Sequence, residues 1–130
     1  MELSIIMPCL NEAETLETCI KKATFFLNHN NIIGEIIIAD NGSTDGSQKI
    51  ALKNGAKIVN VKEIGYGSAL IAGIEFSSAQ FIMMGDSDDS YDFYNLSPFL
   101  NKLREGNELV MGNRFKGGIE KDAMPPLHKS

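Results

Sequence analysis

The sequence predicts an α/β fold in which a mainly parallel β-sheet carries helices on both faces. Short apolar runs alternate along the chain with stretches of roughly ten residues or more that have apolar residues at helical spacing. The runs contain few polar residues, which is typical of strands that are covered on both sides. A length of 130 residues is typical of one domain. We therefore expect residues 1–130 to form a single α/β domain.

The chain is expected to open with a strand and a helix. Leu3 to Met7 is an apolar strand, and we expect Pro8 to end it because proline has no N–H for a central strand. Asn11 and Glu14 have the spacing of a capping box, which predicts the start of a helix. The apolar stripe of this helix comprises Leu16, Cys19, Ile20, Ala23, Phe26 and Leu27.

A second strand and a second helix follow. Ile36 to Ala39 is an apolar strand, and Asp40 to Gly42 is a strong turn signal at its end. Ser43 or Thr44 is expected to cap the helix that follows. We expect Asp45 to serve the start of the same helix rather than to contact a ligand.

The later elements continue this alternation. They are a left-handed turn at Gly55, a strand over Ala56 to Val61, a helix after Gly65 that buries Leu70, Ile71 and Ile74, a strand over Phe81 to Met84, a helix capped by Ser97 and ended by Gly106, and a strand over Leu109 to Met111.

Composition and charge exclude several classes of protein. The chain is 43% hydrophobic and 22% charged, and its formal net charge of -5 argues against nonspecific nucleic-acid binding. No apolar run approaches the length of a transmembrane helix, and we expect no signal peptide. Cys9 and Cys19 suit neither a disulfide framework nor a zinc site, so we expect reduced thiols and a cytoplasmic location.

An acidic stretch follows the predicted strand over Phe81 to Met84. Asp86 and Asp88 are separated by one residue, so in extended backbone both carboxylates can point toward one hard cation. The small Ser87 between them leaves the approach open. An EF-hand is excluded, because Tyr91 stands where such a loop requires glycine. The pattern predicts a divalent metal held beside a phosphorylated ligand.

Distinctive polar residues follow each predicted strand, where open parallel sheets bind their ligands. They are Asn11 and Glu12, Asp40 and Asn41, Gly65 to Gly67, Asp86 and Asp88, and Asn113 and Arg114. We expect these residues at one rim of the sheet, which is then the ligand site. Asp40, Asn11 and Glu12 can hydrogen-bond a ribose hydroxyl or a base. Arg114 can add a contact to phosphate.

The sequence lacks the motifs that are typical of several other classes of ligand-binding protein and enzyme. The first turn reads Pro-Cys-Leu-Asn, and Leu70 stands where Gly65 and Gly67 would need a third glycine, which disfavours a dinucleotide oxidoreductase. The chain has no Walker A sequence, no His-Glu-x-x-His and no Gly-x-Ser-x-Gly. The remaining features indicate a nucleotide that carries a diphosphate and a leaving group.

Several segments resemble, in order, the motifs of family 2 glycosyltransferases. They are Ser4 to Glu12, Ile38 to Asp45, Gly65 to Ala69 and Gly85 to Asp88. Gly112 to Gly118 and Met124 to His128 resemble the branch that transfers a sugar to polyprenyl phosphate, similar to dolichyl-phosphate mannosyltransferases and undecaprenyl-phosphate glucosyltransferases.

The resemblance implies a GT-A fold, a nucleotide-sugar donor (a UDP-sugar or GDP-mannose) and Mg²⁺ or Mn²⁺ as cofactor. It implies that Asp86 and Asp88 bind the metal. Donor-binding roles are implied for Pro8, Asn11, Glu12, Asp40, Asn41, Gly67, Ala69 and Asp86, and catalytic roles for Asp88 and Arg114. The implied reaction is sugar transfer, with polyprenyl phosphate as the expected acceptor and the cytoplasmic face of a membrane as the expected location of the full-length protein.

Two alternatives stay open, and one expectation concerns length. The first alternative is a nucleotide-sugar-binding module without catalysis. The second is a phosphotransferase of the haloacid-dehalogenase kind, whose motif Asp86 to Ser90 fits superficially. Because proteins of the resembled kind are longer, we expect 130 residues to be an N-terminal fragment that binds donor weakly and transfers no sugar by itself.

Overall fold

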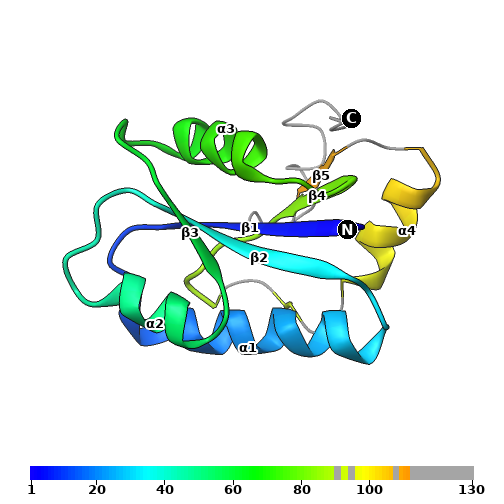
Figure 1. The fold of residues 1–130 in the computed structure, drawn as a ribbon, viewed down its shortest axis with the longest axis horizontal. Helices are drawn as coiled ribbons and strands as arrows, with labels where there is room; N and C mark the ends of the chain where they lie inside the picture. Colours follow the sequence, from blue (N-terminus) through cyan, green and yellow to red (C-terminus); the bar gives the residue numbers. More distant parts are fainter. Residues whose placement is uncertain (90–91, 94–95, 107–108, 112–130) are drawn as a thin grey trace.

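The fold is a parallel sheet whose strands alternate with helices along the chain (Figure 1). The computed structural model describes residues 1–89, 92–93, 96–106 and 109–111. Within these residues a 5-stranded sheet has the order β3-β2-β1-β4-β5, and all neighbouring strands are parallel. The elements are β1 (Leu3–Cys9), α1 (Ala13–His29), β2 (Gly34–Asp40), α2 (Ser47–Lys53), β3 (Lys57–Asn60), α3 (Tyr66–Phe76), β4 (Phe81–Met84), α4 (Ser97–Arg104) and β5 (Leu109–Met111). The predicted alternation and the parallel sheet are confirmed, whereas the assignment of residues 1–130 to one domain stays a prediction.

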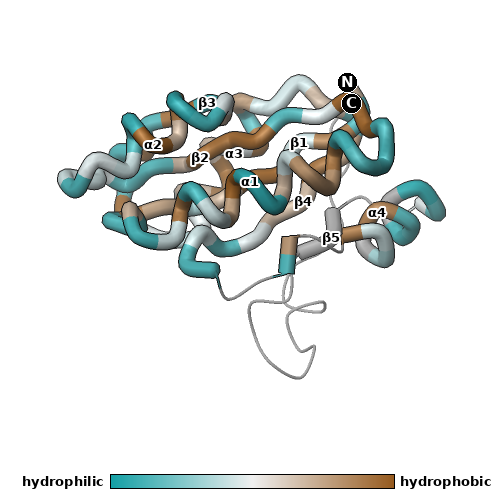
Figure 2. Tube along the Cα trace, turned by 90° about the horizontal axis from the view of Figure 1, so that it is seen from below, coloured by the Kyte–Doolittle hydropathy of each residue, from teal (hydrophilic) through white to brown (hydrophobic). Residues whose placement is uncertain are grey.

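Helices cover both faces of the sheet, with α3 on one face and α1 and α2 on the other (Figure 1). Adjacent residues of one strand therefore enter different cores. In β1, Ile5 belongs to the core under α1, and Ile6 belongs to the core under α3. In β2, Ile36 and Ile37 divide in the same way. The strands are apolar at nearly every position because both of their sides are buried, and Figure 2 shows this as brown segments in β1 and β2.

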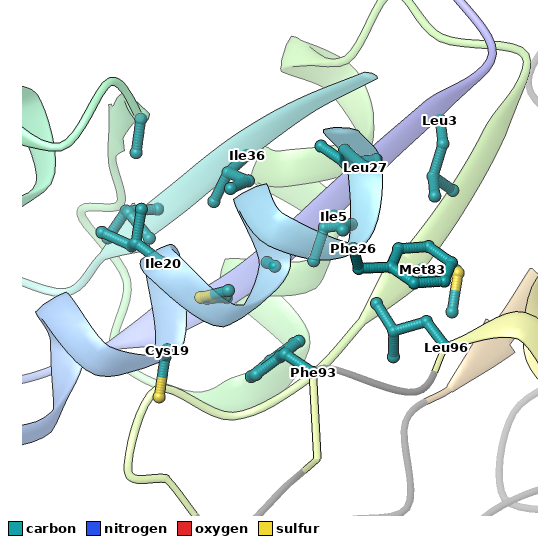
Figure 3. Packing of buried hydrophobic residues seen from close by; sticks show 14 of the residues in the cluster. Leu3, Ile5, Cys19, Ile20, Phe26, Leu27, Ile36, Met83, Phe93 and Leu96 are labelled. Carbon is teal, nitrogen blue, oxygen red and sulfur yellow. The ribbon is translucent and has the colours of Figure 1, made fainter. Parts of the chain in front are cut away.

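The larger core lies between α1 and the sheet. Every position of the predicted stripe is buried: Leu16, Cys19, Ile20, Ala23, Phe26 and Leu27. Phe26 lies beside Met83 of β4 and Leu96 (Figure 3). Burial of each large apolar side chain contributes about 1.5–3 kcal/mol relative to exposure. Phe93 and Leu96, which come between the acidic stretch and α4 in the sequence, also belong to this core.

Pro8 lies inside β1, so the prediction that it ends the strand is wrong. Strand β1 pairs with β2 along its whole length as far as Cys9, but it pairs with β4 only as far as Ile6. The Cys9 carbonyl accepts a hydrogen bond from Asn41 on the β2 side, so the carbonyl of Pro8 points to the opposite side. There it accepts a hydrogen bond from Ser87 Oγ at 2.8 Å. The proline nitrogen faces a position where the β4 ladder has ended, so no ladder hydrogen bond is lost.

The caps predicted for α1 and α2 are also wrong. Asn11, the expected first residue of a capping box, has a left-handed φ of 54°, and α1 begins at Ala13 without a side-chain cap from its own preceding residue. Helix α2 begins at Ser47, beyond Ser43 and Thr44. The predicted capping residues instead form contacts between loops, and these contacts shape the candidate site.

Helix α3 packs on the sheet through small residues. It buries Ala69, Leu70 and Gly73. Ile71, which was predicted to be buried, is 59% exposed, whereas the predicted Ile74 packs against the core under α3. The buried stripe is centred on Ala69 and Gly73, and the helical period then turns Ile71 toward solvent.

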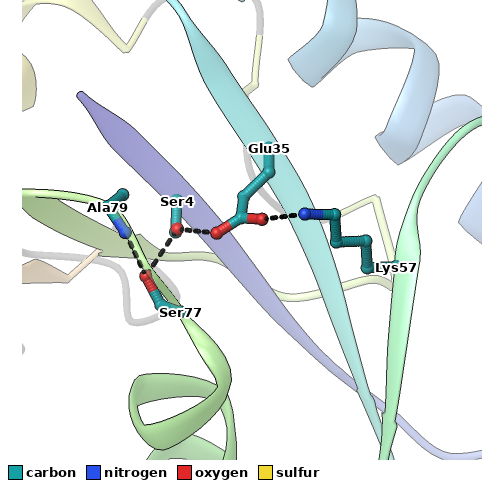
Figure 4. A network of polar contacts seen from close by, with 5 residues as sticks. All are labelled: Ser4, Glu35, Lys57, Ser77 and Ala79. Carbon is teal, nitrogen blue, oxygen red and sulfur yellow. Dashed lines mark hydrogen bonds and ion pairs between the residues drawn. The ribbon is translucent and has the colours of Figure 1, made fainter. Parts of the chain in front are cut away.

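A buried polar network joins the strands at their amino ends, opposite the candidate site (Figure 4). Ser4 Oγ donates to Glu35 Oε2 at 2.6 Å, and Lys57 Nζ donates to Glu35 Oε1 at 2.7 Å. Ser77 Oγ lies 2.6 Å from Ser4 Oγ and accepts a hydrogen bond from the Ala79 amide. The network links β1, β2, β3 and the segment before β4, and it satisfies the carboxylate of Glu35, which is only 7% exposed.

Candidate functional site

A pocket of about 270 Å³ opens at the carboxyl ends of the strands. Strand β1 lies between β2 and β4, so this rim contains the topological switch point where parallel sheets bind ligands. The pocket is lined by Pro8, Cys9, Leu10, Glu12, Asn41, Ile64, Gly65, Tyr66, Asp86, Ser87 and Asp88. The predicted site residues among them are Pro8, Glu12, Asn41, Asp86 and Asp88.

The acidic loop, defined here as residues 85–89, brings two carboxylates into the pocket. The Gly85 amide donates to the Ile6 carbonyl and extends the β4 ladder by one step. Ser87 is 2% exposed, and Asp86 and Asp88 on either side of it both line the pocket. The buried serine thus anchors the loop while its acidic neighbours face the ligand space.

Glu12 adds a third acidic group to the pocket wall. Burial raises the pKa of the Glu12 carboxyl, and the negative charges of Asp88, Asp45 and Asp86 raise it further. Mutual repulsion of this kind is relieved by a bound cation. Within the described part of the chain, no cluster of three or more His, Cys, Asp and Glu side chains has a metal-binding arrangement.

The donor set fits a hard divalent cation that takes part of its coordination from a ligand. Asp86 and Asp88 offer oxygen atoms and come from one short loop. Mg²⁺ in proteins is commonly held by one or two carboxylates together with substrate phosphates and water. The chemistry of the two aspartates is therefore that of a site completed by a phosphorylated ligand.

Asp40 lies fully buried at the end of β2 and organises the loop that follows it. Ser43 donates to both of its carboxylate oxygens, through its amide at 2.9 Å and through Oγ at 2.5 Å. Gln48 Nε2 donates at 2.7 Å. Burial raises the pKa of the Asp40 carboxyl, but the hydrogen bonds from Ser43 and Gln48 outweigh it and hold the pKa below its usual value. Asp40 does not line the pocket, and its predicted contact to the donor stays a prediction.

Asn11 connects the loop after β1 with the loop after β2. The backbone N–H of Asn11 donates a hydrogen bond to Ser43 Oγ at 2.9 Å, and its side-chain Oδ1 accepts one from the backbone N–H of Thr44 at 2.8 Å. The left-handed φ of Asn11 suits a residue type that tolerates this conformation. Asn11 thus lies beside the pocket rather than in its lining, and its predicted donor contact is untested.

Asp45 joins the starts of two helices. Its Oδ1 accepts hydrogen bonds from the amide and hydroxyl of Ser47, the first residue of α2. Its Oδ2 accepts from the amide of Ala13, the first residue of α1, at 2.9 Å. Asp45 was expected to cap α2; the N-cap position is Gly46, and Asp45 serves the helix start from one residue earlier, through Ser47. The second role at α1 escapes sequence reasoning because the two helices are distant in the chain.

Asn41 lines the pocket and also holds the loop before α3, which forms another part of the pocket lining. Its Nδ2 donates to the Glu63 carbonyl at 2.8 Å, which fixes the loop that carries Ile64 and Gly65. Ile64 is 81% exposed, and Leu10 on the other wall is 45% exposed. Sequence reasoning missed these two apolar pocket residues. For Leu10 the available signal was an apolar side chain placed directly after a strand, whereas Ile64 lies in the longer loop between β3 and α3.

The other predicted site residues lie outside the pocket lining or outside the described residues. Gly67 is in the first turn of α3, where an added Cβ would meet nothing within 4 Å. Ala69 is fully buried in the core under α3. Arg114 lies outside the described residues. The donor roles of Gly67 and Ala69 and the phosphate role of Arg114 stay predictions.

The profile of the family "Glycosyl transferase family 2" matches residues 4–130. The chain belongs to this family. Family 2 membership leaves the haloacid-dehalogenase alternative without support. The predicted resemblance to family 2 glycosyltransferases is confirmed.

Two proteins of Haloferax volcanii are similar to this family 2 chain. The low-salt glycan biosynthesis hexosyltransferase Agl6 is 40% identical over 128 residues, which are 98% of this chain and 31% of Agl6. The dolichyl-phosphate hexose transferase is 27% identical over 129 residues, which are 99% of this chain and 54% of that protein. The chain therefore spans about a third to a half of the length of these relatives.

Solved structures agree with the fold of this family 2 chain. Glucosyl-3-phosphoglycerate synthase from Mycobacterium tuberculosis, in complex with Mn²⁺, UDP-glucose and phosphoglyceric acid, superposes with a TM-score of 0.59 and 28% sequence identity. The likeness covers 66% of this chain and 33% of the synthase. The predicted GT-A type of α/β fold is confirmed. In the described part of the chain, no helix is long and apolar enough to cross a membrane.

Proposed function

We propose that this chain is the donor-binding part of a glycosyltransferase that binds a nucleotide-diphosphate sugar together with Mg²⁺ or Mn²⁺. The observation that carries the proposal is the placement of Asp86 and Asp88 in one pocket at the switch point of the sheet. Two carboxylates suit a cation that also binds a diphosphate. The complex of the similar synthase with Mn²⁺ and UDP-glucose supports the proposal.

The residues around the pocket have distinct proposed roles. Asp86 and Asp88 hold the cation, and Asp88 positions it beside the reacting diphosphate. Pro8, Glu12 and Asn41 form the walls against which the nucleoside lies. Asp40 and Asn11 hold the loops that carry these walls and present polar groups at their edge. Gly67, Ala69 and Arg114 keep the roles implied by the family resemblance, at the start of α3 and at a phosphate.

Electrostatic stabilisation is the proposed catalytic principle. When bound, the divalent cation stabilises the charge that develops on the departing nucleotide diphosphate. The acidic loop contributes by keeping its carboxylates in place before the donor arrives, so that little reorganisation accompanies the reaction. The three acidic residues Glu12, Asp86 and Asp88 would repel a diphosphate that came without a cation.

The proposed acceptor is a polyprenyl phosphate, reached at the cytoplasmic face of a membrane. The similarity to the dolichyl-phosphate hexose transferase of Haloferax volcanii supports this acceptor. Because the chain spans 54% of that relative, sugar transfer by the whole protein is part of the proposal.

Calorimetric titration tests the proposal directly. The 130-residue chain is titrated with UDP-glucose, UDP-GlcNAc and GDP-mannose, each with and without Mn²⁺. We expect the chain to bind one class of donor, and we expect this binding to require Mn²⁺. Equal binding with and without the metal, or no binding of any donor, contradicts the proposal. A turnover assay on a longer form of the protein then separates a transferase from a nucleotide-sugar-binding module without catalysis.

A further inference from the structure

We propose that Thr15 of α1 is a positioning residue that holds the acidic loop so that Asp86 and Asp88 share one cation. The inference rests on the proposed function, and it assigns a role to a side chain that does not line the pocket. Thr15 lies in the first turn of α1, far from the acidic loop in sequence.

The contact that carries the inference is a hydrogen bond from Thr15 Oγ1 to the Ser87 carbonyl, 2.6 Å long. The same hydroxyl lies 3.4 Å from the Glu12 carbonyl and 3.5 Å from Glu12 Oε2. A threonine hydroxyl has one proton to donate. Because the Ser87 contact is by far the shortest, that proton belongs to the acidic loop.

The serine between the two aspartates is held from two directions. Its carbonyl accepts from Thr15, and its Oγ donates to the Pro8 carbonyl at 2.8 Å. Fixing the backbone and side chain of Ser87 also fixes the directions in which the side chains of its two neighbours leave the loop. Removal of one support would let the two carboxylates move apart, as their mutual repulsion favours.

A second contact from the same helix holds the end of the loop. Lys22 Nζ lies 2.9 Å from Asp89 Oδ1, and Asp89 has a left-handed φ of 63°. Helix α1 thus holds the acidic loop at its centre through Thr15 and at its end through Lys22. A loop that is held at two points loses less conformational entropy when it binds a cation.

Helix α1 offers a matched control for the experiment. Thr18 lies on the same helix and is exposed, so Thr18→Val makes the same chemical change away from the loop. Thr15→Val keeps the shape of the side chain and removes its hydroxyl, and Thr15→Ser restores a hydroxyl. Thr15→Ala is a second disruptive variant that folds readily, because alanine has the higher helix propensity.

The experiment has two readouts on the purified chain. The first is the affinity for Mn²⁺ alone, measured by the loss of the free-ion signal in electron paramagnetic resonance. The second is amide hydrogen exchange over residues 85–89 in the absence of metal. We expect Thr15→Val to weaken Mn²⁺ binding about three- to tenfold, as for the loss of one hydrogen bond, and to speed exchange in this segment. Thr15→Ser and Thr18→Val are expected to behave like the unmodified chain.

The outcomes separate this inference from the proposed function. If the unmodified chain binds no Mn²⁺, with or without a nucleotide sugar, the proposed function fails and the inference fails with it. If the unmodified chain binds Mn²⁺ and both Thr15→Val and Thr15→Ala bind it equally well, the inference alone is overturned. Equal weakening by Thr18→Val would also overturn it, because the effect would then be a general one on α1.

Discussion

Gly73 of α3 lies directly against Ile6 of β1. A Cβ atom added to Gly73 would lie 2.6 Å from Ile6 Cγ2 and 2.9 Å from Ile6 Cδ1. Ile6 is fully buried at the centre of the sheet. A glycine inside a helix costs about 0.5–1 kcal/mol relative to alanine. This cost is offset because close packing brings α3, and with it the pocket residue Tyr66, onto the sheet.

Gly73→Ala is therefore expected to destabilise the protein. Overpacking of a buried position costs about 1–3 kcal/mol, which exceeds the gain in helix propensity. Thermal unfolding measures the effect, and Gly67→Ala is the control on the same helix, because a Cβ at Gly67 meets nothing within 4 Å. Similar or raised stability of Gly73→Ala would show that α3 can move away from Ile6 at little cost.

Glu35→Gln is expected to change how stability depends on pH. Burial raises the pKa of the Glu35 carboxyl, but the bonds from Lys57 and Ser4 outweigh it and bring the pKa below its ordinary value of 4.5. A carboxyl of lowered pKa contributes stability that is present above its unfolded pKa and is lost as the pH falls through the folded pKa. The free energy of unfolding should therefore decline less steeply below about pH 4.5 in Glu35→Gln than in the unmodified chain.

The same variant should be less stable at neutral pH, by about 1–3 kcal/mol, because a charged hydrogen-bond acceptor is replaced by an amide. Urea unfolding at several pH values provides both measurements. Glu105→Gln is the matched control, since Glu105 is exposed. Parallel pH profiles for Glu35→Gln and the unmodified chain would contradict the prediction.

Asp45→Ala is expected to lower the melting temperature and to weaken donor binding together. The substitution removes the acceptor for the Ala13 amide at α1 and for the fully buried Ser47 at α2. Helix starts lose stability when such an acceptor is removed. Asp45→Asn keeps one acceptor oxygen, so its melting temperature should lie between those of Asp45→Ala and the unmodified chain. Calorimetry of unfolding and donor titration on the same samples test this, and an unchanged melting temperature would refute the shared-cap role.

Asp88→Asn is expected to weaken Mn²⁺-dependent donor binding about tenfold or more, which corresponds to about 1.4 kcal/mol. The carboxylate lines the pocket, and because Asp88 is exposed we expect no large loss of stability from the change. Asp92→Asn removes the same charge from an exposed residue outside the pocket lining and is the control. Titration with the preferred donor and Mn²⁺ compares the donor affinities of the two variants. Equal affinities of Asp88→Asn and Asp92→Asn would argue against a metal at Asp88.

Much of the fold could be predicted because its signals are local. The apolar run Phe81–Met84 forms a strand with the predicted bounds, and the stripe from Leu16 to Leu27 is buried at each predicted position. The predicted gathering of polar residues at the carboxyl ends also succeeded for Glu12, Asn41 and the Asp86–Asp88 pair. Parallel strands require their carboxyl ends to meet at one rim, so chain order alone places these residues together.

Other features depend on partners that chain order does not reveal. Pro8 continues β1 because β4 ends before reaching it, and Asn11 takes a left-handed conformation because the Thr44 amide lies opposite. Ile71 is exposed because close contact at Gly73 fixes the rotation of α3. In each case a local preference is overruled by a contact between distant segments.

The amino-acid sequence by itself determined the α/β class, the order of the elements, the apolar stripe of α1 and the acidic pair after β4, because periodicity and strand order are properties of neighbouring residues. Tertiary structure alone decided that Asp45 serves two helices, that Asn41 holds the loop before α3 and that Thr15 supports the loop of Asp86 and Asp88. The physical reason is that a short polar side chain has several possible partners, and only the packed fold selects which of them lies within hydrogen-bonding distance.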